Sequence, residues 1–281
     1  MKIFEDIPDM QKFAESVRKS GKRIGLVPTM GYLHEGHLSL IRNIRKSCDV
    51  VVVSVFVNPT QFGIGEDLNK YPRDFKRDQE LCRKENVDIV FYPEVPKMYP
   101  EGYDTYITVE KFSGIMCGVS RPTHFQGVTT VVAKLFNIVK PHIAIFGEKD
   151  YQQAIIIKKM VQDLNFDIVI ETSPIIRESD GLALSSRNKY LNKNDRKNAV
   201  LLYQSLQHAK KLFQKGERDI LIIKQEMAKM ILQIPNARID YIEIVAPDTL
   251  RSPDQIQERA VAAVAVFIGK TRLIDNLLLE Q

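Results

Sequence analysis

The apolar positions of the chain follow one pattern before residue 174 and a different pattern after it. Before it, short apolar runs alternate with segments of helical period, and the runs cover residues 24–27, 49–57, 88–92, 142–146 and 167–171. Runs without polar alternation are typical of strands that are covered on both faces, as in a parallel sheet. Residues 24–57 form a strand–helix–strand unit with an expected right-handed crossover. We therefore predict an α/β fold with a Rossmann-like, doubly wound parallel sheet over residues 1–174.

The C-terminal part of the chain changes to helices followed by strands. Helical periodicity predicts helices over residues 194–215 and 219–232. Strands are expected over residues 238–245, 261–268 and 271–274. The last two are expected to form a hairpin across Gly269-Lys270. Helices followed by antiparallel strands indicate a separate domain, so we predict a smaller α+β C-terminal domain over residues 175–281.

Composition and charge restrict the partners of the chain. Its 281 residues exceed one typical domain, and 44% hydrophobic with 27% charged residues is typical of a globular protein. The net charge is only +5, and basic residues are interleaved with acidic ones, which argues against a nucleic-acid-binding surface. No apolar run approaches the about 18 residues of a membrane span. We expect small anionic substrates, no nucleic-acid partner and no membrane partner.

The cysteine pattern indicates a reducing compartment. Cys48, Cys82 and Cys117 are widely separated and form no CxxC motif or Cys/His cluster, so no zinc site is suggested. Their odd number and the absence of a disulfide framework fit a protein kept reduced. The first residues lack the continuous apolar segment of a secretory signal. The chain is therefore expected to be cytoplasmic.

Residues 27–40, VPTMGYLHEGHLSL, combine a strand end, a glycine-bearing turn, two histidines and a helix start. His34 and His37 lie on either side of Gly36. A helix N-terminus favours phosphate, and imidazoles placed there can donate hydrogen bonds to phosphate oxygens. Either histidine alone would be interpreted as an ordinary polar residue of a turn. The pair, together with Gly31 and Gly36, favours a nucleotide-binding role.

Residues 58–61 directly follow the second predicted strand, at the sheet edge where ligands of open parallel sheets bind. Asn58 and Gln61 offer neutral donors and acceptors that suit the hydroxyls and carboxylate of a small acid. Asn58-Pro59 is also an efficient turn signal, and a turn role suffices to explain Asn58. Gln61 is the stronger candidate for substrate binding.

The helix expected over residues 71–86 carries two acids on adjacent turns, Asp74 and Asp78. One of them could hold a magnesium-bound water molecule, because magnesium prefers carboxylate and water oxygens. Acids on a solvated helix face are the favoured interpretation. The helix therefore supplies no assigned metal ligand.

The segment before the next long helix also has two interpretations. Thr123 fits an N-cap with Gln126 three residues on, which is the spacing of a capping box. Arg121 and His124 in the same segment can instead bind anions. The residues by themselves favour neither interpretation.

A strand–glycine–helix arrangement recurs over residues 147–153, GEKDYQQ. Lys149 can meet a phosphate as a compact point charge, and Asp150 can accept hydrogen bonds from ribose hydroxyls. A lysine near a helix start opposes the helix dipole, so a purely structural origin is disfavoured. Gln153 lies one turn further along and suits a small polar substrate.

Ser185, Ser186 and Arg187 supply two hydroxyls and a guanidinium on one short segment. These groups suit a pyrophosphate leaving group, although a serine here can also cap the amphipathic segment that follows. The candidate residues together describe a site for a nucleoside triphosphate. None of them is an evident nucleophile, so a bound substrate is expected to attack phosphorus while the protein supplies placement and charge neutralisation.

These segments also occur in the order of a known family. PTMGYLHEGHLSL resembles the H-x-G-H signature of the nucleotidyltransferase-like α/β superfamily that includes class I aminoacyl-tRNA synthetases. FGEKDYQQ, RESDGLALSSRN, FVNPTQF, YPR and RPTHF are similar to further blocks of one member family. With them, the chain resembles the pantoate–β-alanine ligase (pantothenate synthetase) family. In that resemblance the Ser-Ser-Arg segment corresponds to the K-M-S-K-S loop of the superfamily.

The resemblance implies an AMP-forming ligase that makes a C–N bond. It implies condensation of (R)-pantoate with β-alanine to pantothenate, a step of coenzyme A biosynthesis, through a pantoyl adenylate and with release of pyrophosphate. ATP would be a substrate, Mg²⁺ would be required, His37 would donate the proton, and a homodimer would form through the N-terminal domain. The loop over residues 63–70 and the second domain would cover the adenylate, and no metal ligands are assigned.

Site residues follow from the resemblance, position by position. Catalytic roles are implied for His37, His34, Lys149, Ser185, Ser186 and Arg187. ATP binding is implied for Met30, Gly31, Tyr32, Leu33, His34, Glu35, Gly36, His37, Gly147, Glu148, Lys149, Asp150, Ile176, Leu184, Ser185, Ser186 and Arg187. Substrate binding is implied for Gln61, Gln153, Asn58, Arg121 and His124.

Other functions are open from the sequence. Another small-molecule adenylyl- or cytidylyltransferase of the superfamily would act on a phosphate rather than a carboxylate. AMP production that needs both pantoate and β-alanine would separate the ligase from it. A nucleotide-binding regulator would bind ATP without turnover. An RNA-associated module is disfavoured by the scattered positive charge.

Overall fold

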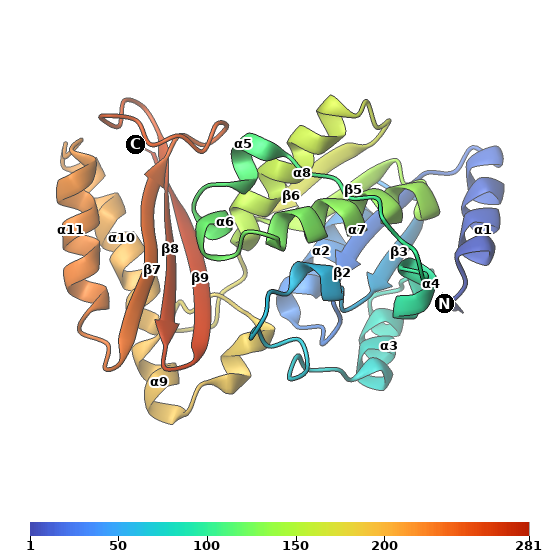
Figure 1. The fold of residues 1–281 in the computed structure, drawn as a ribbon, viewed down its shortest axis with the longest axis horizontal. Coiled ribbons are helices and arrows are strands. Elements are labelled where there is room, and N and C mark those ends of the chain that lie inside the picture. Colours follow the sequence, from blue (N-terminus) through green and yellow to red (C-terminus); the bar gives the residue numbers. More distant parts are fainter. Residues whose placement is uncertain (281) are drawn as a thin grey trace. The chain divides into compact units, whose positions relative to one another are not determined.

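The computed structural model describes residues 1–280, which fold as two compact units (Figure 1). The first unit consists of Met1–Glu148 and Gln153–Pro174. The second unit consists of Lys149–Gln152 and the described residues from Ile175 onward. The grouping of Lys149–Gln152 with the later residues was not expected from the sequence.

The first unit contains the predicted parallel sheet. Its strands are β1 (Lys2–Phe4), β2 (Ile24–Thr29), β3 (Val50–Val55), β4 (Ile89–Phe91), β5 (Ile143–Gly147) and β6 (Val169–Ser173). They pair in the order β1-β4-β3-β2-β5-β6, and every pair is parallel. The chain runs outward in one direction from β2 and in the other from β5, so the switch point lies between these neighbouring strands. Ligands of open α/β sheets bind at the carboxyl ends of strands at such a point.

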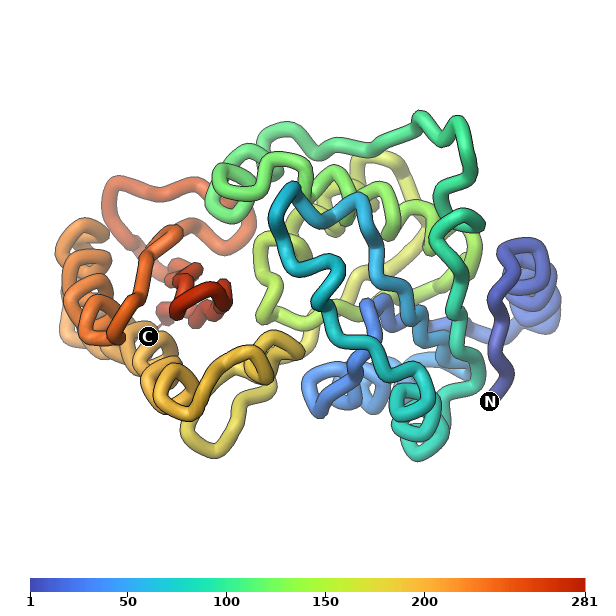
Figure 2. The backbone as a smooth tube through the Cα atoms, turned by 60° about the horizontal axis from the view of Figure 1, so that its bottom comes forward, coloured from blue at the N-terminus to red at the C-terminus, as the bar shows by residue number. Residues whose placement is uncertain are grey.

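Helices cover both faces of this sheet. The helices packed against it are α1 (Ile7–Lys19), α2 (Glu35–Arg45), α3 (Phe75–Lys84), α7 (His124–Val139) and α8 (Tyr151–Asp163). The connections also contain the short helices α4 (Val95–Met98), α5 (Glu110–Ser113) and α6 (Cys117–Ser120) and a 3₁₀ turn η1 (Pro59–Gln61). Val50 and Val52 of β3 pack in one apolar cluster with α1 and α7, whereas Val51 and Val53 pack in another with α2 and α3. Figure 2 shows α2 and α3 side by side along one side of the first unit. The uninterrupted apolar runs therefore reflect burial on both faces, as predicted.

The second unit has a three-stranded antiparallel sheet and three helices. Its elements are 3₁₀ turns η2 (Glu148–Asp150) at its first segment and η3 (Ser186–Tyr190), helices α9 (Lys193–Asn198), α10 (Val200–Gln214) and α11 (Ile220–Ile231), and strands β7 (Ala237–Val245), β8 (Ala260–Ile268) and β9 (Thr271–Leu279). The sheet order is β7-β8-β9, with the predicted hairpin at Gly269, whose φ is 58°. The α+β character expected from the sequence is confirmed.

Three predicted elements have wrong limits. Helix α3 begins at Phe75 rather than residue 71, because Asp74 caps it by accepting the main-chain N–H of Arg77 at 3.1 Å. The single helix expected over residues 194–215 is interrupted at Ala199. Strand β9 continues to Leu279 rather than ending near residue 274. Among the described residues, no helix has the length and apolar character needed to cross a membrane.

Candidate active site

The turn after β2 has a backbone that depends on glycine. Thr29 Oγ1 donates to the carbonyl of Ser54 at 2.7 Å and accepts the N–H of Gly31 at 3.1 Å. Gly31 and Tyr32 then adopt positive φ angles of 79° and 52°. A Cβ on Gly31 would lie 2.9 Å from Val55 Cγ1 and 3.0 Å from Asp78 Oδ2. The turn is therefore both left-handed and closely packed, and only glycine fits its first position.

The two histidines lie together at the N-terminus of α2. Their ring centroids are 4.1 Å apart, and the main-chain N–H of His34 donates to His37 Nδ1 at 3.3 Å. Because Nδ1 accepts this bond, the neutral ring of His37 carries its proton on Nε2, the nitrogen that can donate to a phosphate oxygen. A Cβ on Gly36 would lie 2.9 Å from His34 Cε1, so the His34 ring lies directly over this glycine. The structure thus brings the predicted pair together where a helix favours anions.

Asp78 does not belong to a solvated face, so this expectation was wrong. Its side chain is 1% exposed, and its carboxylate accepts the main-chain N–H groups of Tyr32 at 2.8 Å and Leu33 at 2.7 Å. Burial raises the pKa of the Asp78 carboxyl, although these two hydrogen bonds oppose the shift. Asp74 caps α3 as described above. Asp78 therefore supports, from α3, the turn over residues 30–34 that leads to the two histidines (the histidine turn).

Gln61 and Asn58 form a buried pair on η1. Asn58 Nδ2 donates to Gln61 Oε1 at 3.1 Å and to the carbonyl of Gly127 at 3.0 Å. Asn58 Oδ1 accepts the hydroxyls of Thr60 at 2.9 Å and Tyr99 at 2.8 Å. The polar atoms of Asn58 are thus used within the protein, and they orient the Gln61 amide.

The Gln61 amide reaches the histidine turn. Its Nε2 lies 3.1 Å from Met30 Sδ, one residue before Gly31. Helix α7 supports η1 at close range, since a Cβ on Gly127 would lie 2.3 Å from the carbonyl oxygen of Thr60. The predicted substrate residue and the predicted nucleotide turn are therefore neighbours in the first unit.

Arg121 and His124 hold the main chain of Gln61. Arg121 Nε and Nη2 donate to the Glu66 carboxylate at 2.7 and 2.6 Å, and Nη2 also donates to the Gln61 carbonyl at 3.2 Å. His124 Nδ1 lies 2.9 Å from the same carbonyl. Thr123 is the N-cap residue of α7, as predicted, but the capping box is wrong, because Thr123 makes no side-chain cap bond and Gln126 donates to Thr108 at 3.0 Å.

Lys149 follows the end of β5, where η2 leads into α8. Its carbonyl accepts Asn276 Nδ2 of β9 at 3.1 Å, and two residues later the Tyr151 hydroxyl donates to the carbonyl of Pro247 at 3.1 Å. These bonds explain why Lys149–Gln152 groups with the second unit. Asp150 is exposed, and Gln153 is half-buried on α8.

The Ser-Ser-Arg segment follows a small antiparallel hairpin. The hairpin pairs Arg177 with Ala183 and turns through Gly181, whose φ is 98°. Ser185 then caps η3 by accepting the N–H of Arg187 at 3.2 Å, as the capping alternative predicted. Ser186 is 8% exposed. Capping fixes the main chain here and leaves the phosphate-binding role a prediction.

Sequence reasoning missed Asp275 and Asn276 on β9. The Asp275 carboxylate accepts both terminal nitrogens of Arg177, at 2.6 and 2.9 Å, and the guanidinium lies 3.8 Å from the ring centroid of Tyr203. Asn276 holds the Lys149 carbonyl, as described above. Asn276 thus anchors the segment of Lys149, and Asp275 anchors the hairpin that precedes the Ser-Ser-Arg segment. Polar residues inside an apolar run were the only signal in the sequence.

Other predicted ATP-binding residues differ in their burial and in their hydrogen-bond partners. Leu33 is completely buried, so its side chain belongs to the core. The Glu35 carboxylate accepts hydrogen bonds from Arg42 at 2.5 and 3.2 Å, and this partner lowers the pKa of Glu35. Glu148 Oε1 accepts the Thr172 hydroxyl at 3.1 Å. Residues 1–280 contain no group of three or more His, Cys, Asp or Glu side chains that could hold a metal ion.

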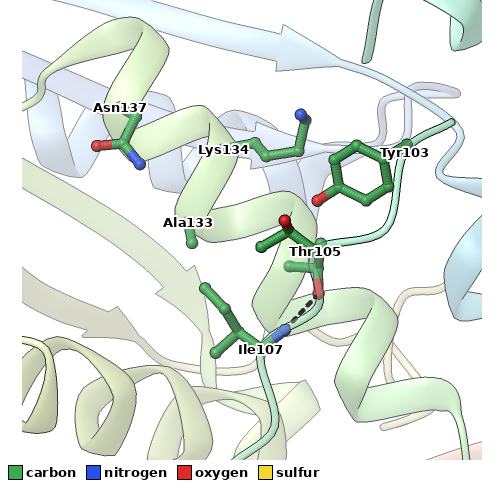
Figure 3. A pocket seen from close by; sticks show the side chains of 7 residues that line it. Tyr103, Thr105, Ile107, Ala133, Lys134 and Asn137 are labelled. Carbon is green, nitrogen blue, oxygen red and sulfur yellow. Dashed lines mark hydrogen bonds between the residues drawn. The ribbon is translucent and has the colours of Figure 1, made fainter. Parts of the chain in front are cut away.

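A cavity of about 250 Å³ lies elsewhere in the first unit, between α7 and the segment before α5 (Figure 3). It is lined by Tyr103, Thr105, Ile107, Thr130, Ala133, Lys134 and Asn137. The Lys134 ammonium lies 4.5 Å from the ring centroid of Tyr103, and burial lowers the pKa of this lysine. None of the predicted site residues lines this cavity.

Comparison with known proteins places this geometry in one family. The family model for pantoate-beta-alanine ligase matches residues 2–278. The pantothenate synthetase of Thermotoga petrophila is 55% identical over 279 residues, which cover 99% of this chain and 100% of that protein. The pantothenate synthetase of Caldicellulosiruptor bescii is 52% identical over 280 residues, which cover 100% of this chain and 99% of that protein.

Solved structures agree with the sequence comparisons. A crystal structure of pantothenate synthetase from Thermus thermophilus has a TM-score of 0.94 and 42% identity, with 100% of both chains covered. The pantoate–β-alanine ligase from Francisella tularensis, complexed with β-γ ATP and β-alanine, has a TM-score of 0.81 and 35% identity over 100% of this chain and 98% of that one. By its full-length match in sequence and fold, the chain belongs to the pantoate–β-alanine ligase family, whose members form a C–N bond.

Proposed function

We propose that this chain condenses (R)-pantoate with β-alanine at the expense of ATP, giving pantothenate, AMP and pyrophosphate through a pantoyl adenylate. The observation that carries the proposal is the pair of imidazoles at the N-terminus of α2, in a chain of this family. The buried Gln61 contacts Met30 in the turn that leads to this pair. A transferase acting on a phosphate substrate has no comparable support, because the family assignment covers the whole chain.

In the first step the pantoate carboxylate attacks the α-phosphorus of ATP. A carboxylate is anionic at neutral pH and needs no general base. The Gln61 amide binds pantoate, while Asn58 orients that amide and Arg121 and His124 fix its main chain. These three residues are therefore positioning groups for Gln61. Holding the carboxylate near phosphorus supplies much of the rate.

Charge on the departing pyrophosphate is stabilised by groups from three segments. His34 and His37 donate from the start of α2, Lys149 contributes a point charge after β5, and the Ser-Ser-Arg segment contributes two hydroxyls and a guanidinium. Asp150 accepts the ribose hydroxyls. His37 is the proton donor of the group, consistent with a neutral ring that carries its proton on Nε2.

Mg²⁺ would be held chiefly by the phosphates of ATP and by water, because magnesium usually keeps several waters and binds through substrate phosphates. It would neutralise charge on the phosphate oxygens. The protein's own contribution is to orient the phosphates against the histidine pair.

In the second step the β-alanine amine attacks the acyl carbon of the adenylate and AMP leaves. Gln61 and Gln153 hold the small substrates for this attack. The adenylate is a mixed anhydride that water would hydrolyse, so its survival depends on exclusion of water, to which the loop over residues 63–70 contributes. The protein would work as a homodimer in the cytoplasm. None of Cys48, Cys82 and Cys117 forms a disulfide within the described residues, which suits a reducing compartment.

Mass spectrometry of reaction products tests the proposal. The protein is incubated with ATP, Mg²⁺, pantoate and β-alanine, and each component is omitted in turn. Pantothenate and AMP are expected only in the complete mixture. Pyrophosphate release that needs neither pantoate nor β-alanine would contradict the proposal, and ATP binding without turnover would support a regulator instead.

A further inference from the structure

Two neighbouring side chains of α3 reach the turn that carries the histidines. The Asp78 carboxylate accepts the N–H groups of Tyr32 and Leu33. Arg77 Nη1 donates to the carbonyl of Leu33 at 2.8 Å, and its guanidinium lies 5.3 Å from the ring centroid of Tyr32. Helix α3 therefore binds both donors and an acceptor of the two residues that directly precede His34.

The turn presents two neighbouring N–H groups to one acceptor, the Asp78 carboxylate. The successive N–H groups of Tyr32 and Leu33 point to one carboxylate, and successive N–H groups of a turn can form a concavity that binds anions. In this protein the concavity after Gly31 is filled by Asp78, which is 1% exposed. A buried N–H pair without an acceptor would be costly, so the carboxylate satisfies the turn. The substrate phosphate is left to the groups that follow, from His34 onward.

The position of His34 depends directly on the hydrogen bonds that Asp78 and Arg77 make to Tyr32 and Leu33, here called the clamp. Leu33 is completely buried and links the clamped residues to His34, the N-cap of α2. His34 in turn donates its N–H to His37. Because Leu33 is held at both its N–H and its carbonyl and directly precedes His34, a shift of the turn is expected to move both rings.

We propose that Asp78 and Arg77 are positioning residues that set the place of His34 and His37 for adenylate formation. The proposal rests on the function proposed above for the histidine pair. Neither residue touches substrate; both act through the main chain of the turn. A displacement of about 1 Å at a reacting centre lowers a rate by roughly 10²-fold.

The first test is Asp78→Asn, which keeps the side-chain size but turns an NH₂ group toward one of the two N–H donors. The rate constant for pantoate-dependent exchange of pyrophosphate into ATP is expected to fall about 10²-fold, with the KM for pantoate nearly unchanged. Asp74→Asn is the matched control, because Asp74 caps the same helix without touching the turn. It should leave the exchange rate near that of the wild type.

The second test is Arg77→Ala, since Arg77 is exposed and its removal leaves the core intact. Imidazole resonances are followed by NMR, and the chain has only five histidines to assign. The resonances of His34 and His37 are expected to shift, while those of His142 and His208 stay in place. If Arg77 contributed only to stability, its removal would not selectively shift the resonances of His34 and His37.

The outcomes separate this inference from the proposed function. If folded Asp78→Asn and Arg77→Ala variants keep wild-type exchange rates and unshifted His34 and His37 resonances, the positioning role is wrong. If Asp78→Asn does not fold, the Arg77→Ala spectra and exchange rate decide by themselves. If the wild-type protein shows no pantoate-dependent exchange, the proposed function fails, yet the resonance shifts still test the clamp.

Discussion

Replacing Gly36 by alanine should separate catalysis from stability in the histidine turn. Gly36 lies in the first turn of α2 and has an ordinary helical backbone, so alanine suits its conformation. The added methyl group, however, would lie 2.9 Å from His34 Cε1 and 3.0 Å from His34 Nδ1. The obstacle is the His34 ring rather than main chain, so the ring moves and the helix stays.

The size of the effect follows from these distances. Carbon atoms in contact prefer about 3.5 Å or more, so the ring must shift by about 0.6 Å. Since about 1 Å of misplacement lowers a rate roughly 10²-fold, we expect a loss of about tenfold in adenylate formation. Alanine in a helix stabilises by up to about 1 kcal/mol relative to glycine, and a displaced rotamer costs a similar amount. The free energy of unfolding should therefore change by less than about 1 kcal/mol.

The assay is pantoate-dependent exchange of pyrophosphate into ATP, with chemical denaturation measured on the same preparations. Gly114→Ala is the control, because a Cβ there meets only the Glu110 carbonyl at 3.8 Å, an ordinary contact. Wild-type exchange by the Gly36→Ala variant would show that the position of the His34 ring does not limit adenylate formation. So would a loss of activity that is explained entirely by a loss of folded protein.

Two further predictions concern Lys149 and the pH dependence of stability. Asn276→Ala removes the hydrogen bond to the Lys149 carbonyl and should lower kcat/KM for ATP by about tenfold in the exchange assay. The KM for pantoate should stay unchanged. An unaltered dependence of the rate on ATP would disprove the anchoring role of Asn276. His142 accepts the N–H of Ile24 through Nδ1 at 2.9 Å, and burial lowers the pKa of this histidine. Its contribution to stability is therefore complete above its unfolded pKa of about 6.5 and is lost as the pH falls below that value, by at most about 1.4 kcal/mol per pH unit. Thermal unfolding between about pH 7.5 and about pH 5 should show a steeper loss for the wild type than for His142→Gln, and equal slopes would contradict this.

The sequence was informative where burial is uniform and interactions are local. The apolar run at β3 predicted a strand covered on both faces because alternate valines pack into separate clusters. The strand, glycine turn and helix start around His34 are set by neighbouring residues, so their order could be predicted from the sequence. The hairpin at Gly269 is equally local.

Long-range contacts explain what the sequence did not predict. Strand β1 has only three residues and pairs with β4, more than eighty positions away. Asp78 is an acid whose partners are main-chain N–H groups of a distant turn, although its spacing from Phe75 and Cys82 on one helix face could have indicated burial. Strand β9 was predicted too short because Asp275 breaks its apolar pattern, and its partner Arg177 cannot be identified from spacing.

The contacts of some candidate residues could be identified only from the structure. Asn58 was expected either to bind substrate or to make a turn, and its amide donates to Gln61 Oε1 and to the Gly127 carbonyl, so substrate binding by Asn58 stays a prediction. Arg121 was expected either to bind anions or to belong to a capping segment, and it pairs with Glu66 while holding the Gln61 carbonyl. Such supporting roles depend on which backbone atoms come within reach, and residue type alone does not reveal them.

Three segments are proposed to act on one step, the departure of pyrophosphate from ATP. This shared role is tested by pantoate-dependent pyrophosphate exchange with His37→Ala, Lys149→Ala and Arg187→Ala, beside the reaction of preformed pantoyl adenylate with β-alanine. Each variant is expected to lose at least about 10²-fold in exchange and far less in the second reaction. Wild-type exchange by any folded one of the three would contradict the shared role.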